Sequence, residues 1–112
     1  MINSDKKIRV LIVDDSALMR EALRSILDGD PDIEVIAMAK DGKEGVEKAF
    51  TLKPDVITMD LKMPVMTGLE AIETIMQEQP IPIIVASSMD VDVIVKALAV
   101  GAMDFVSVAQ DL

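Results

Sequence analysis

The chain has 112 residues, half of them apolar, which is enough for one domain around a single core. It contains no cysteine and no histidine, which excludes disulfides, thiolate nucleophiles and the usual zinc sites, so any metal must be bound by oxygen. A formal net charge of −9 with scattered basic residues argues against nucleic acid as a partner. No apolar stretch approaches the roughly 18 residues of a membrane span and the first residues lack a signal-peptide core, so we expect a cytoplasmic protein without membrane contact.

Apolar runs and helical stretches alternate along the chain. Five short apolar runs predict buried β-strands at residues 8–13, 33–39, 55–59, 81–86 and 104–108. Between them, apolar residues at helical spacing predict four helices around residues 19–27, 46–50, 69–76 and 91–98. This alternation predicts an α/β fold with a doubly wound parallel sheet, right-handed crossovers and the strand order 2-1-3-4-5.

The end of the chain departs from a complete doubly wound fold. Only residues 109–112 follow the fifth predicted strand, so the helix that should share a face of the sheet with the first helix is missing. Depending on their facing, some of the following apolar side chains should be partly exposed: Ile8, Val10, Ile12, Phe105 and Val106. We therefore expect the chain to self-associate, with a homodimer as the simplest form.

Three aspartates fall at the carboxyl ends of the first and third predicted strands. Asp14 and Asp15 close the first strand and Asp60 closes the third; these strands are neighbours in the predicted order, so the carboxylates should converge. At roughly 4 Å and an effective dielectric near 20, each like-charged pair would cost about 4 kcal/mol, which requires a hard cation or a protonated carboxylate. Helix capping by Asp15 or Ser16 is the alternative for the pair, and an ordinary loop acid is the alternative for Asp60. We favour a metal site beside an aspartate that could accept a phosphoryl group.

Two features nearby admit both a functional and an ordinary explanation. Ser87 follows the fourth predicted strand, and its hydroxyl either donates to a phosphoryl oxygen on Asp60 or belongs to a simple turn. The helix around residues 91–98 carries only Asp92 and Lys96 as charges. It is therefore either tucked deeply into the domain or exposes part of its apolar surface to a partner.

Two segments, VLIVDDSALMR at residues 10–20 and MDLKMPVMTGLEA at residues 59–71, resemble the receiver domain of two-component response regulators. The segments IIVASS at 83–88 and GAMDFV at 101–106 are most similar to receivers at the front of chemotaxis-type protein-glutamate methylesterases. The similarity runs from residue 8 to about residue 106. It implies a flavodoxin-like fold, phosphorylation by a histidine kinase and a magnesium-dependent switch. It also implies that the chain is not itself an enzyme and is the regulatory part of a methylesterase.

The resemblance assigns roles to the residues around the predicted metal site. Asp60 matches the phosphoacceptor, which is also a magnesium ligand. Asp15 matches the direct magnesium ligand and Asp14 the acid that acts through a water. The backbone carbonyl of Lys62 matches the third protein ligand.

The resemblance also covers the switch, with one departure. Ser87 matches the switch hydroxyl and Phe105 the switch aromatic, which would act on an output domain or partner through the fourth helix and fifth strand. Family receivers carry Lys-Pro after the fifth strand, where this chain has Val108-Ala109. That lysine normally contacts the phosphoryl group, so we expect Lys62 to stand in for it in part. We interpret residues 1–112 as a receiver domain that lacks its last helix and any output domain.

Three other functions compete with this interpretation. A degenerate receiver that acts as a phosphorylation-independent docking module would explain Val108 and the apolar fourth helix. A phosphohydrolase of the haloacid dehalogenase type needs a second aspartate two places after the nucleophile, where this chain has Lys62. A flavodoxin would have to cradle a phosphate where Asp14 and Asp15 repel it. The sequence leaves the cognate kinase and the output domain open.

Overall fold

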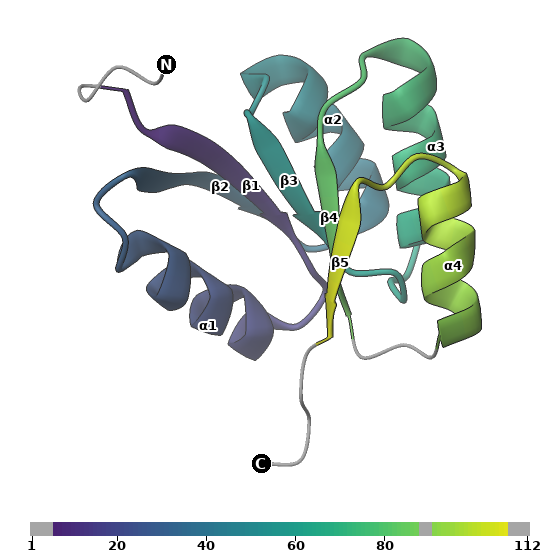
Figure 1. Cartoon of the computed structure of the whole chain (residues 1–112), viewed down its shortest axis with the longest axis horizontal. Coiled ribbons are helices and arrows are strands. Elements are labelled where there is room, and N and C mark those ends of the chain that lie inside the picture. Colours follow the sequence, from purple (N-terminus) through teal and green to yellow (C-terminus); the bar gives the residue numbers. More distant parts are fainter. Residues whose placement is uncertain (1–5, 88–90, 108–112) are drawn as a thin grey trace.

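The computed structural model describes residues 6–87 and 91–107 and contains a five-stranded parallel sheet in the order β2-β1-β3-β4-β5 (Figure 1). The strands are β1 (Ile8–Val13), β2 (Ile33–Ala39), β3 (Val56–Met59), β4 (Ile83–Ser87) and β5 (Asp104–Ser107). The predicted fold class and strand order are therefore confirmed. β3 starts one residue later than predicted, and β4 starts at Ile83 because Pro82 has no N–H for the ladder. The predicted last residue of β5, Val108, lies outside the described residues.

Four helices connect the strands: α1 (Ala17–Asp28), α2 (Gly42–Leu52), α3 (Gly68–Glu78) and α4 (Val91–Ala99). The side chains that precede the first three helices, Ser16, Asp41 and Thr67, each accept a hydrogen bond from a backbone N–H in the first helical turn. Figure 1 shows α1 on one face of the sheet and α2, α3 and α4 on the other. We call the face with α1 the open face and the face with the other three helices the closed face.

The closed face holds the continuous core of the domain. Alternate side chains of the inner strands point towards α2, α3 and α4, and the apolar stripes of these helices pack onto them. Complete burial of one large apolar side chain contributes about 1.5–3 kcal/mol relative to leaving it exposed. The largest fully buried side chains of this core are Leu11, Val13, Ile57, Met59, Ile72, Ile75, Ile83 and Val85.

The open face is less completely covered. No residue of α1 is buried, and Leu18 and Ile26 are 80% and 72% exposed, although Ile26 has the spacing of an inward residue. The expectation of exposure is wrong for Val10 and Ile12, which are buried because β1 lies between β2 and β3 with α1 packed across it. Val106, at the far edge of the sheet from α1, is 56% exposed as expected.

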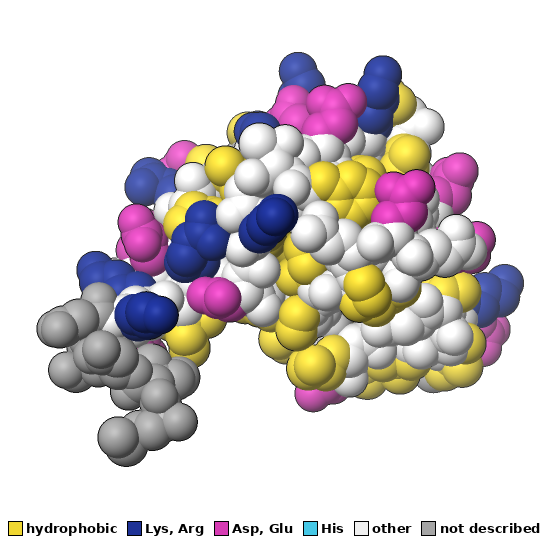
Figure 2. Space-filling view, turned by 90° about the horizontal axis from the view of Figure 1, so that it is seen from above, with side chains coloured by type: hydrophobic (Ala, Val, Ile, Leu, Met, Phe, Trp, Pro, Cys, Tyr) yellow, Lys and Arg dark blue, Asp and Glu magenta, His cyan; other side chains and the backbone are white. Residues whose placement is uncertain are grey.

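Charged side chains of both signs share the surface. On the face drawn in Figure 2, Lys and Arg lie among acidic and apolar side chains. Within the described residues, Arg24 pairs with Glu21 and Asp28 on α1, and Lys48 pairs with Glu44 on α2. These basic groups are therefore engaged with acids of their own helices. None of the helices in the described part of the chain is long and apolar enough to cross a membrane.

Candidate functional site

The structure brings the three aspartates together at the carboxyl edge of the sheet. β1 and β3 are neighbours, and Val13 lies opposite Met59, so the next residue of each strand reaches the same edge. The backbone N–H of Asp60 donates to the carbonyl oxygen of Val13 at 2.9 Å, which ties the two strand ends together. One carboxylate oxygen each from Asp14, Asp15 and Asp60 lie within 4.8 Å of one another.

Asp14 is the buried member of this cluster, with 5% of its surface exposed. Its backbone N–H donates to the Ala39 carbonyl at 3.0 Å, and its carboxylate Oδ1 accepts from the Ser16 N–H at 2.9 Å. Burial raises the pKa of Asp14 above its ordinary value of 3.8, and the charge of Asp15 raises it further. The Ser16 N–H and the Arg20 guanidinium act in the opposite direction. Burial has the largest effect, so the pKa of Asp14 stays above its ordinary value.

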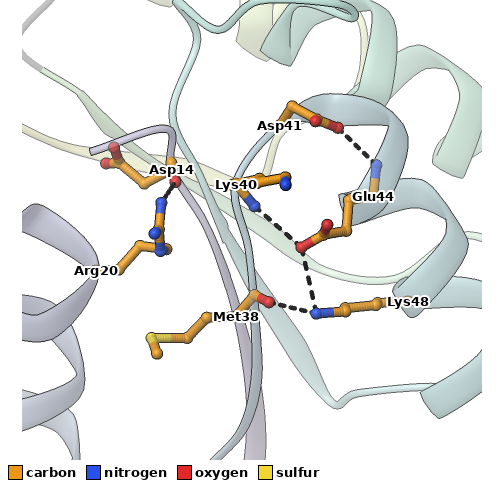
Figure 3. Close-up of polar contacts among 7 residues, drawn as sticks. All are labelled: Asp14, Arg20, Met38, Lys40, Asp41, Glu44 and Lys48. Atoms are coloured by element: carbon orange, nitrogen blue, oxygen red, sulfur yellow. Dashed lines mark hydrogen bonds and ion pairs between the residues drawn. The ribbon is translucent and has the colours of Figure 1, made fainter. Parts of the chain in front are cut away.

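Arg20 connects α1 to the acidic cluster. Its guanidinium donates to the backbone carbonyl of Asp14 at 2.8 Å (Figure 3). Ser16 caps α1 through its hydroxyl, which accepts from the Met19 N–H at 3.2 Å. Ser16 is therefore the residue that caps α1, and the Asp15 carboxylate belongs to the acidic cluster.

The loop from Asp60 to α3 is tightly folded. The N–H of Gly68 donates to the Leu61 carbonyl at 3.0 Å, and the N–H of Met66 donates to the Pro64 carbonyl at 2.8 Å. Val65, at the centre of that three-residue turn, has φ 70°, which is rare for a β-branched residue. A Cβ on Gly68 would overlap the Asp60 carbonyl and lie 2.6 Å from the Leu61 Cα, so no larger residue fits there without moving this loop.

Lys62 and Phe105 are the other predicted site residues that the structure describes with their side chains. Lys62 is exposed in the loop after Asp60, and its ammonium group makes no ion pair within the described residues. Phe105 is 43% exposed and lies opposite Val85, so it points to the closed face near the edge of the sheet. Ser87 ends β4, but its side chain lies outside the described part of the structure, as does Val108.

α4 combines both of the arrangements that its composition allowed. Ile94 and Ala97 are buried in the core of the closed face, whereas Val95 and Leu98 are exposed. The helix is therefore tucked in on one side and leaves an apolar stripe on the other.

Sequence reasoning assigned no role to Arg20, Gly42 or Gly68. Arg20 stands four residues after the helix cap, and side chains there lean back towards the start of the helix. This spacing was the available signal for its contact with Asp14. In the sequence, Gly42 and Gly68 look like ordinary residues at the start of a helix. What distinguishes them is close contact with the loop after Asp60, which is distant from Gly42 in the chain and folds back onto Gly68.

Known proteins of one family match this chain over nearly its whole length. The family described as the response regulator receiver domain matches residues 10–110. A protein-glutamate methylesterase/protein-glutamine glutaminase from Carboxydothermus hydrogenoformans is 60% identical over 104 residues, covering 90% of this chain and 29% of the relative. A relative of the same description from Thermotoga maritima is 50% identical over 107 residues, covering 93% of this chain and 31% of the relative. The chain thus spans less than a third of the length of these curated relatives.

Solved structures agree with this assignment. The response regulator domain of Thermotoga maritima CheB is 50% identical with a TM-score of 0.87, and the match covers 91% of this chain and 78% of that one. A chain of the CheX-CheY complex with beryllofluoride and magnesium from Borrelia burgdorferi is 30% identical with a TM-score of 0.88, covering 98% and 86%. From the family match, the strand order and these relatives, we conclude that the chain belongs to the response regulator receiver domain family and is similar to the receivers of CheB-type protein-glutamate methylesterases.

Proposed function

We propose that this chain is the phosphoryl-accepting receiver of a chemotaxis-type two-component system, in which Asp60 takes a phosphoryl group from a histidine kinase. The observation that carries the proposal is the convergence of Asp14, Asp15 and Asp60, with carboxylate oxygens within 4.8 Å of one another at the carboxyl edge of the sheet. Ligands of parallel α/β sheets bind at this edge, where the strand order reverses. The family match supports the same function.

The residues present fit Mg²⁺ as the cofactor. The Asp15 and Asp60 carboxylates and the backbone carbonyl of Lys62 would hold the ion, with Asp14 acting through a water. These are hard oxygen donors, and Mg²⁺ is commonly bound by one or two carboxylates together with waters and phosphate oxygens. When bound, Mg²⁺ neutralises negative charge on the acids and on the phosphoryl oxygens. The solved relative with beryllofluoride and magnesium supports Mg²⁺ as the metal.

Asp60 would act as the nucleophile. One of its carboxylate oxygens attacks the phosphorus of a phosphohistidine, so that an O–P bond forms as the P–N bond breaks. The electron pair of the broken bond stays on the imidazole, which takes up a proton from solvent. The donor supplies the energy, and the chain supplies position through the hydrogen bond from the Asp60 N–H to Val13.

The phosphoryl group would be sensed by the Ser87 hydroxyl and Phe105 and communicated through α4 and β5. Exposed apolar side chains on these two elements and in the connection between them support a role in docking: Val95, Leu98, Met103 and Phe105. We propose that residues 1–112 are the receiver segment of a longer cytoplasmic regulator with a further helix. Its output domain would be the methylesterase named in the relatives, which are more than three times as long as the matched segment.

Intact-mass measurement after treatment with acetyl phosphate and Mg²⁺ tests the proposal. We expect one added phosphoryl group in the natural chain and none in Asp60→Asn, with the fold retained. Asp92→Asn changes an exposed carboxylate on α4 in the same way and should leave the modification intact. Beryllofluoride should perturb the NMR signals of the acidic cluster only when Mg²⁺ is present. Modification that persists in Asp60→Asn would show that the acceptor is a different residue.

A phosphorylation-independent docking module is the second candidate function. The exposed apolar stripe of α4 and the valine at position 108 favour it. A natural chain that gains no mass under these conditions but binds its output domain would support this alternative and overturn the phosphoacceptor proposal.

A further inference from the structure

The N-terminus of α2 lies directly against the loop that carries Asp60. Gly42, the first residue of α2, is buried beside Met66 of that loop. A Cβ on Gly42 would overlap the Met66 carbonyl oxygen and lie 2.9 Å from its carbonyl carbon and 3.0 Å from its Cβ. The neighbouring atoms belong mainly to the backbone, so turning a side chain cannot make room. Any side chain at position 42 must displace either the helix or the loop.

The helix is held in place more firmly than a free helix end would be. The Asp41 carboxylate caps α2 by accepting from the Glu44 N–H at 2.8 Å, and the Glu44 carboxylate accepts from the Lys40 N–H at 3.2 Å (Figure 3). Lys48 binds the same Glu44 carboxylate at 3.3 Å and the Met38 carbonyl at 2.6 Å. These bonds fasten the first turns of α2 to the end of β2, so the loop is the part that would yield.

The loop after Asp60 contains a strained backbone conformation, so it should change shape when the contact with α2 is disturbed. Val65 precedes Met66 and has φ 70°, a conformation that a β-branched residue keeps only when its surroundings enforce it. Its side chain is largely exposed, so its own apolar packing does not explain the conformation. Gly42 meets the loop at the residue after Val65, and Gly68 meets it at Asp60 and Leu61.

We propose that Gly42 is a positioning residue for phosphoryl acceptance. Through its close contact with Met66, which we call the backstop contact, α2 holds the strained loop that carries Asp60 in its reactive geometry. This inference rests on the proposed function of Asp60. The start of α2 would then influence the rate at which Asp60 accepts a phosphoryl group, although no side chain of the β2–α2 connection is assigned to the metal site. A displacement of about 1 Å at a reacting group can lower a rate by roughly 10²-fold.

Gly42→Ala tests the backstop contact, with Val46→Ala as its matched control. Alanine suits a helix better than glycine, so its effect at position 42 comes from the contact with Met66. Val46→Ala removes volume from the core side of the same helix and adds nothing near the loop. At a temperature where both variants are folded, we expect phosphorylation by acetyl phosphate to be about 10- to 100-fold slower in Gly42→Ala and within twofold of the natural rate in Val46→Ala. Backbone amide signals of residues 60–63 and 65–68 should shift in Gly42→Ala and not in Val46→Ala.

A second pair of variants keeps the inference testable if Gly42→Ala does not fold. Val65→Gly makes the turn beside Met66 easier to deform. In the combined variant Gly42→Ala/Val65→Gly the loop can therefore shift away from the added methyl group while the domain stays folded, and Asp60 shifts with the loop. The combined variant should be phosphorylated at least tenfold more slowly than Val65→Gly alone. Equal rates in both comparisons would overturn the role of the backstop contact while leaving the acceptor role of Asp60 intact. Failure of the natural chain to accept a phosphoryl group would overturn the proposed function and this inference together.

Discussion

The two faces of the sheet belong to the same five strands but differ in the helices that cover them. On the closed face, three helices pack side by side and bury a continuous apolar core. On the open face, α1 covers β1 and β2, no residue of α1 is buried, and Val106 of β5 remains 56% exposed. The difference shows that an apolar stripe on a helix predicts which side faces inward but not how completely that side is covered. The closed face should therefore contribute most of the free energy of unfolding, and self-association of the chain should occur through the open face.

The largest expected effect compares one isoleucine from each face. Ile72 of α3 is completely buried, so Ile72→Ala should lower the free energy of unfolding by about 2–5 kcal/mol through lost burial and the cavity that remains. Ile26 of α1 is largely exposed, and Ile26→Ala should change it by no more than about 0.5 kcal/mol. Urea denaturation of the two variants measures both values. Equal losses would mean that the open face is as well packed as the closed one.

Self-association of the 112-residue chain should come from the open face. Exposing a few hundred Å² of apolar surface costs several kcal/mol at roughly 25 cal/mol per Å², and a second copy can cover it. We expect sedimentation at low micromolar concentration to detect dimers or larger species, and Ile26→Glu to shift them towards monomer. Val95→Glu places the same charge on an exposed position of α4 and should leave association unchanged. A natural chain that stays monomeric would show that the open face needs no further cover.

The pH dependence of stability should report on Asp14, which lies at the sheet edge shared by both faces. Its pKa is raised in the folded state, so the folded protein holds this proton more tightly than the unfolded chain does. The free energy of unfolding should therefore fall as the pH rises from the ordinary value of 3.8 through the raised pKa, by about 1.4 kcal/mol for each unit that separates the two.

Asp14→Asn should remove this decline and make the metal-free protein more stable at pH 7. Urea denaturation between pH 4 and pH 7 measures the difference in stability between the variant and the natural chain. Mg²⁺ should reduce this difference by stabilising the natural chain more than the variant, which lacks the acid that acts through a water. If Asp14→Asn is less stable than the natural chain at pH 7 without metal, burial is not the dominant effect on the pKa of Asp14.

The smallest expected effect concerns positive charge near Asp60. Lys62 is exposed in the loop after Asp60, and its flexible side chain can bring the ammonium group over the acidic cluster. Lys62→Ala should therefore slow phosphorylation by acetyl phosphate a few-fold. Val108→Lys, which places a lysine where the resemblance to receivers implies one, should accelerate phosphorylation or prolong the modified state. Lys96→Ala removes an equal charge from α4 and serves as the control. If neither Lys62→Ala nor Val108→Lys alters the rate or the lifetime, positive charge is not limiting at this site.

Much of the fold and the place of the acidic cluster could be predicted because both follow from local patterns. Buried parallel strands read as apolar runs, and the strand order alone brings the residues after β1 and β3 to one edge. The contact of Gly42 with Met66 could not be predicted in this way. It depends on the distance between atoms from separate elements, which hydrophobic periodicity does not record. The contact of Arg20 with Asp14 is local, and only its spacing from the helix cap indicated it.

The order of the parallel strands and the convergence of Asp14, Asp15 and Asp60 follow from the amino-acid sequence, since strand direction and chain order place the ends of β1 and β3 at one edge of the sheet. Which apolar side chains are covered, by contrast, depends on how the elements pack together. Val10 and Ile12 are buried because β1 has strands on both sides and a helix across it, whereas Val106 and Ile26 stay exposed. Only the tertiary structure brought the start of α2 against the Asp60 loop, because close packing of two distant backbone segments depends on the whole sheet and its helices being assembled.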